Sequence, residues 1–105
     1  QETIVDFKTS DEYVICKPML LKEGGLYKMW YCCRGGLYRI GYAESSDGKR
    51  FQRMDNEVGL GVTPGAWDGD MVEYAFVFDY KENRYMVYNG NNYGKTGLGL
   101  AVLSK

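Results

Sequence analysis

Histidine is absent from this chain of 105 residues, and proline occurs only twice. Without histidine the chain has no imidazole ligand for zinc and no Ser–His or Cys–His nucleophile pair. No apolar run approaches the ~20 residues of a membrane-spanning helix. The net charge is −1, and no basic stripe marks a nucleic-acid-binding face. We therefore expect no nucleic-acid partner, no membrane partner, no metal and no cofactor.

Cysteine is also sparse, with Cys16, Cys32 and Cys33. An odd number of cysteines does not make a closed disulfide framework. Neighbouring residues of a strand point to opposite faces, so Cys32 and Cys33 are poorly placed to bind one metal ion together. We interpret the three as small apolar strand residues, which slightly favours a cytoplasmic location.

Glycine and tyrosine are abundant instead, with fourteen and ten residues. Many glycines beside few prolines indicate tight turns between regular segments. Tyrosine favours strands and surfaces that are half apolar and half wet. This composition predicts an all-β fold.

An internal repeat is the most informative feature of the sequence. Residues 27–31 (YKMWY) match residues 84–88 (RYMVY) at a spacing of 57 positions. Residues 40–43 (IGYA) match residues 98–101 (LGLA) at a spacing of 58, and residues 18–21 fall on residues 75–78. Repeats of this length are typical of solenoids, propellers and arrays.

Each repeat predicts a series of short antiparallel strands joined by hairpins. Glycine pairs and Asp47-Gly48 supply the turn signals. The expected strands cover residues 13–21, 26–33, 38–45 and 51–54 in a first unit (about 11–56), and residues 71–79, 84–89 and 98–103 in a second (about 66–105). Residues 1–10 are an outer strand of a neighbouring blade or fill the place beside the last strand. The predicted fold class is two successive four-stranded blades of a β-propeller.

Residues 25–31 and 40–48, with residues 67–68, 73–77 and 85–90 of the second unit, resemble a known blade signature. It is that of the five-bladed propeller glycoside hydrolases, a clan that includes arabinofuranosidases, β-xylosidases and invertases. The resemblance implies a single partial propeller domain of about two blades. It also implies a carbohydrate substrate, bound in a central funnel where acidic residues from different blades meet.

The resemblance makes Glu73 the expected general acid. Ala75 stands where the family usually has proline, and Lys17 stands where another blade often has an aspartate. Glycoside hydrolysis needs two carboxyl groups on either side of the scissile bond, and one of them must stay protonated. We therefore expect burial to raise the pKa of Glu73, and we expect hydrolysis only if missing blades supply the other carboxylates.

Around Glu73, five further residues are candidates for sugar contacts because of their aromatic, amide or charged groups: Arg34, Trp67, Asp68, Tyr74 and Asn89. The main interpretation is a glycoside hydrolase-like fragment that is inactive alone. The alternatives are a non-catalytic carbohydrate-binding module and a self-associating module, with partners in a homo-oligomer or in missing blades of the parent chain.

Overall fold

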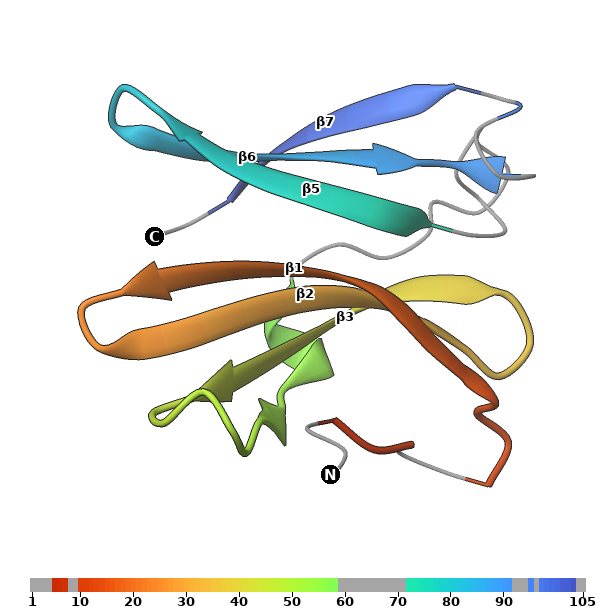
Figure 1. The fold of residues 1–105 in the computed structure, drawn as a ribbon. Helices are drawn as coiled ribbons and strands as arrows, with labels where there is room; N and C mark the ends of the chain where they lie inside the picture. The colour runs from red at the N-terminus through yellow and green to blue at the C-terminus, as the bar shows by residue number, and fades with distance from the viewer. Residues whose placement is uncertain (1–4, 8–9, 59–71, 92–94, 96, 104–105) are drawn as a thin grey trace.

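The computed structural model describes residues 5–7, 10–58, 72–91, 95 and 97–103, arranged as two antiparallel β-sheets. The first sheet has four strands in the order β1-β2-β3-β4, and the second has three in the order β5-β6-β7 (Figure 1). The predicted all-β class is therefore confirmed. The strands are β1 (Val14–Glu23), β2 (Leu26–Arg34), β3 (Tyr38–Ser45), β4 (Gln52–Arg53), β5 (Glu73–Tyr80), β6 (Asn83–Asn89) and β7 (Leu98–Leu103).

Tight turns give these strands their register. Gly24 and Gly25, between β1 and β2, have φ values of 59° and 87°, and Gly48, between β3 and β4, has 76°. Such left-handed conformations suit glycine because it carries no Cβ. Strands β3 and β7 have the predicted bounds, and the others differ from the expected ranges by one or two residues at an end.

The two sheets pack face to face through one apolar core (Figure 1). Trp30 and Tyr42 from the first sheet meet Val77 and Met86 from the second, and Met86 is fully buried. Trp30 and Tyr42 are also ring neighbours, with centroids 5.1 Å apart. Apolar burial is the main favourable term in folding, so this core holds the two sheets together.

The outer face of the first sheet is covered by the chain itself. Tyr31 is buried there, and its hydroxyl donates a 2.7 Å hydrogen bond to Asp55 in the 3-10 helix η1 (Asp55–Val58). A Cβ at Gly41 would lie 2.4 Å from the Tyr31 ring, so the ring needs a glycine opposite it. Arg53 bonds Asp55 and Glu12 and closes this face.

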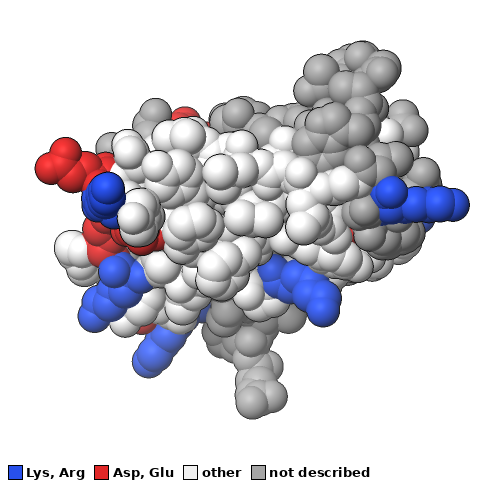
Figure 2. Space-filling model, turned by 90° about the horizontal axis from the view of Figure 1, so that it is seen from above, with Lys and Arg blue, Asp and Glu red and all other residues white. Residues whose placement is uncertain are grey.

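The outer face of the second sheet is bare by comparison. Leu98, Leu100 and Val102 of β7 are 68%, 62% and 67% exposed. Viewed from this side, uncharged residues fill the centre and charged residues lie at the margin (Figure 2). This outer apolar face consists of Phe76, Phe78, Tyr80, Tyr85, Val87, Leu98, Leu100 and Val102.

The N-terminal segment differs from the expectation of a strand. Its described part, residues 5–7, forms none, and Val5 packs against the core on the outer face of the first sheet. The backbone carbonyl of Asp6 accepts a 3.0 Å hydrogen bond from Arg53. The segment therefore lies under the first sheet and not beside β7. Among the described residues, no helix is long and apolar enough to cross a membrane.

Candidate functional site around Glu73

A β-bulge places Glu73 at the start of β5. Glu73 is opposite Asn89 of β6, and regular pairing resumes only at Phe76 and Val87. Within the bulge Tyr74 has a φ of 57°, which is rare for a residue with a side chain. Strained backbone of this kind occurs often at functional sites, because bulges re-aim side chains.

The carboxyl group of Glu73 is buried without a partner. The residue has no exposed surface, and neither side-chain oxygen accepts or donates a hydrogen bond in the described part of the chain. Burial raises the pKa of Glu73, and the positive charge of Arg34 opposes this rise without cancelling it. Burying an unpaired carboxylate is costly, so the group takes up a proton more readily than an ordinary glutamate does.

Tyrosine rings and cations surround the bulge. The Tyr74 ring lies 6.1 Å from the Tyr38 ring, and Lys17 Nζ lies 5.6 Å from the centre of Tyr74. The Arg34 guanidinium stacks over Tyr38 at 5.1 Å and over Tyr13 at 5.7 Å. These distances are within the range of cation–π attraction. The strand ends thus bring together aromatic faces and N–H donors, the two kinds of group that sugar recognition uses.

The first sheet supports this arrangement from below. The Tyr74 N–H donates a 2.9 Å hydrogen bond to Cys32 Sγ, and the Val72 N–H donates a 3.1 Å bond to the Tyr38 carbonyl. Both bonds join the start of β5 to the end of β2 and the beginning of β3. The position of Glu73 is therefore fixed by contacts between the two sheets.

The structure brings Glu73, Tyr74, Arg34 and Asn89 to one end of the two sheets. Trp67 and Asp68 lie outside the described residues. Tyr13 and Tyr38, which stack on Arg34, were not among the residues expected from the sequence. Tyr38 was within reach of prediction, because a hairpin centred on residues 35–37 pairs it with Arg34.

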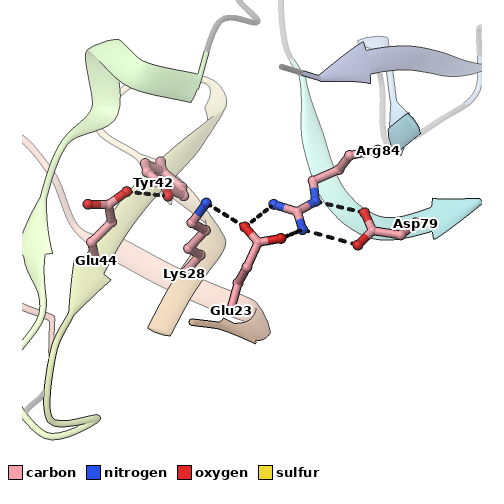
Figure 3. Close-up of polar contacts among 6 residues, drawn as sticks. All are labelled: Glu23, Lys28, Tyr42, Glu44, Asp79 and Arg84. Carbon is pink, nitrogen blue, oxygen red and sulfur yellow. Dashed lines mark hydrogen bonds and ion pairs between the residues drawn. The ribbon is translucent and has the colours of Figure 1, made fainter. Parts of the chain in front are cut away.

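The opposite end of the sheet-to-sheet contact is also polar, but its groups are paired (Figure 3). Arg84, 3% exposed, bonds Asp79 at 2.8 Å and Glu23 of the first sheet at 2.7 Å. Lys28 bonds Glu23 at 2.9 Å. Hydrogen bonds from Arg84 and Lys28 lower the pKa of Glu23 to about 2. This network bridges the sheets and holds its carboxylates ionised.

The chemistry open to the Glu73 site is proton donation and ligand binding. Among the described residues, no group of three or more cysteine, aspartate or glutamate side chains is arranged to hold a metal ion. Glycosidic bond cleavage takes two carboxyl groups about 5–10 Å apart. The half-buried carboxylate of Asp55 is bonded to Tyr31 and Arg53 beneath the first sheet, so it is engaged elsewhere.

Comparison with known proteins supports a glycoside hydrolase-like fold. No family model matches the chain. Two curated relatives, the uncharacterized Mycobacterium tuberculosis proteins Rv1502 (strain H37Rv) and MT1551 (strain CDC 1551), are each 44% identical over 99 residues. The match covers 94% of this chain and 33% of theirs, so the chain spans about a third of the length of the curated relatives it matches.

Solved structures give the same picture. One named "Glycoside hydrolase" superposes with a TM-score of 0.76 at 19% identity over 96% of this chain and 35% of its own. Another, of BT0996 in an RGII complex, has a TM-score of 0.76 at 20% identity over 97% and 36%. At these identities the likeness is one of fold. It agrees with the predicted kinship at that level, whereas the propeller arrangement stays a prediction.

Proposed function

We propose that the chain forms two blades of a five-bladed glycoside hydrolase-like propeller, with Glu73 as the general acid of a carbohydrate site. The single observation that carries the proposal is the buried carboxyl of Glu73, which has no hydrogen-bond partner in the described chain and a raised pKa. A general acid must keep its proton near neutral pH, and burial is the usual means. Arg34, Tyr74 and Asn89, together with Trp67 and Asp68, are the proposed sugar contacts.

The blade assignment rests on the equivalence of two bulges. The β1 bulge lies between Cys16 and Met19, and the β5 bulge lies between Glu73 and Phe76, 57 positions later in each case. Lys17 and Tyr74, at the same spacing, have φ values of 54° and 57°. A shared irregularity at one spacing is what duplicated units would retain.

The outer apolar face gives the proposed blades a place for a third sheet. Met19, Leu21 and Trp30 of the first sheet pack in the core between the sheets. Residues 57 positions later are Phe76, Phe78 and Val87 of the outer apolar face. The contact that joins the first sheet to the second is thus prepared again on the second. We propose that its occupant is a further sheet of the same kind from a longer polypeptide, as the curated relatives are about three times the matched length.

A carboxyl titration tests the general acid. In a sample labelled with carbon-13 at glutamate side-chain carboxyls, we expect the Glu73 signal to titrate above the ordinary value of 4.5. Glu73→Gln assigns that signal, and Glu82→Gln, in the exposed β5–β6 turn, is the matched control. A Glu73 signal that titrates at or below the ordinary value contradicts the general-acid role.

A sugar titration tests the binding site. With arabino- and xylo-oligosaccharides as probes, we expect amide signals of Arg34, Tyr74 and Asn89 to shift, and those of Lys81 and Glu82 to stay in place. The chain alone should not hydrolyse these sugars above background, because no second carboxylate is described beside Glu73. Absence of shifts with every probe contradicts the site.

A non-catalytic carbohydrate-binding module is the second candidate. The stacking of Arg34 between Tyr13 and Tyr38 favours it, because these groups bind a sugar without any acid. Glu73→Gln separates the two functions. It preserves shape and sugar binding in a binding module, whereas in an enzyme assembled with its other carboxylates it removes the proton donor and abolishes turnover.

A further inference from the structure

Cys16 and Cys32 lie directly opposite each other in the ladder between β1 and β2. Opposite residues of an antiparallel pair share one face of the sheet, with Cα atoms about 4.5–5.5 Å apart. A disulfide requires Cα atoms about 4.4–6.8 Å apart. Both cysteines are free thiols in this structure. The register therefore already supplies the backbone spacing of a disulfide.

The surroundings of the pair favour its closure. Cys16 is the last paired residue before the β1 bulge, and pairing resumes only at Met19, so the backbone beside Cys16 is not held by the ladder. Cys16 is half-buried and reachable from solvent, whereas Cys32 is fully buried. Burial raises the pKa of the Cys32 thiol to about 12, and this leaves Cys16 as the point of entry for a reagent.

The third cysteine is excluded from this pairing. Cys33 follows Cys32 and points to the opposite face, where it packs with Met29 and Tyr31. Its Sγ donates a hydrogen bond to the Arg39 carbonyl at 3.7 Å. Cys33 therefore serves as a matched internal control for the other two.

We infer that Cys16 and Cys32 form an oxidisable cross-strand pair whose oxidant is a low-molecular-weight disulfide such as oxidised glutathione. The Cys16 thiol loses its proton, its sulfur attacks the reagent, and the first reduced thiol leaves. Cys32 then loses its proton and attacks the Cys16 sulfur, which releases the second reduced thiol. Two electrons pass from the cysteine pair to the reagent, and the protein gains one S–S bond.

The disulfide would act on the Glu73 site through one contact. Cys32 Sγ accepts the hydrogen bond from the Tyr74 N–H, and Tyr74 directly follows Glu73. Closure rotates the Cys32 sulfur toward Cys16 and so weakens the bond that ties the start of β5 to the first sheet. The inference stands independently of the sugar-binding proposal, because it depends only on the register and the thiols.

Thiol counting tests this pair on the folded chain. After incubation with oxidised glutathione, removal of the reagent and denaturation, we expect titratable thiols to fall from three per chain to one. The intact mass should fall by about 2 Da, with no glutathione attached. Peptide mapping should recover Cys16 joined to Cys32, and the Tyr74 amide signal should shift on closure and return with reductant.

Single substitutions make the result specific. Cys33→Ser should still lose two thiols, whereas Cys16→Ser and Cys32→Ser should form no internal bridge. Circular dichroism of each variant confirms that it is folded, and Cys16→Ala repeats the test with a second side chain. Three titratable thiols after oxidation, a stable glutathione adduct on Cys16, or a bridge to Cys33 would each overturn the inference.

Discussion

The two ends of the contact between the sheets solve the problem of buried polar groups in opposite ways. At one end, Arg84 bonds Asp79 and Glu23, so each charge has a partner (Figure 3). At the other end, Glu73 is buried with both oxygens unpaired in the described chain. A paired network contributes to holding the sheets together, whereas an unpaired acid costs stability. The difference teaches that the Glu73 end is the one that stability does not explain.

Removal of Arg84 should have the largest effect on this comparison. Arg84→Met leaves Glu23 and Asp79 without their shared cation, and we expect a loss of about 2 kcal/mol of unfolding free energy. The figure is below that of a fully buried pair because both carboxylates are about 40% exposed. Urea unfolding measures it, and Arg50→Met, at an exposed arginine between β3 and β4, is the control.

Acid should expose the same network. The pKa of Glu23 is lowered, so its contribution is complete above the ordinary value of 4.5 and is lost as the pH falls toward 2. Wild type should lose this part of its stability on acidification, and Arg84→Met should not. Equal acid sensitivity of the two proteins would show that the network does not hold the sheets together.

The Glu73 end should respond to pH with the opposite sign. Its pKa is raised in the folded protein, so above 4.5 the unfolded chain loses a proton that the folded chain keeps. Stability should then fall by up to about 1.4 kcal/mol per pH unit until the folded pKa is reached. The measurement is the difference in unfolding free energy between wild type and Glu73→Gln at several pH values. A difference that does not change with pH rules this linkage out.

Replacement of the unpaired acid by an apolar residue should stabilise the chain. Glu73→Met keeps a similar volume and removes the desolvated carboxyl, so we expect a gain of about 1 kcal/mol at neutral pH. Thermal unfolding detects it, with Glu82→Met in the exposed turn as control. A loss of stability in Glu73→Met alone would assign the carboxyl a structural role.

The smallest effect should come from the rim of the paired end. Lys28→Met removes one exposed bond to Glu23, and we expect a change of about 0.3 kcal/mol that disappears in high salt. Unfolding in low and high salt measures it. A larger change that salt does not reduce would mean that Lys28 acts through packing of its aliphatic stem.

Much of the fold could be predicted from the sequence, because strands and hairpins are written locally. Glycine turns and alternating apolar residues place β3 and β7 at their observed bounds. The 3-10 helix η1 and the bridge from Arg84 to Glu23 could not be read in the same way, since both depend on residues distant in sequence. Glu73 was predicted through the resemblance. Its lack of partners and the stacking of Tyr13 on Arg34 emerge only when the sheets meet.

The paired bulges of β1 and β5 carry a consequence for how such proteins change. Each bulge presents the residue before it opposite a fixed position of the next strand: Cys16 opposite Cys32 in one sheet, Glu73 opposite Asn89 in the other. The same socket thus accepts a thiol couple or an acid with an amide, while the surrounding ladder keeps its register. New chemistry can be acquired at these sockets by exchanging two side chains, without redesign of the scaffold.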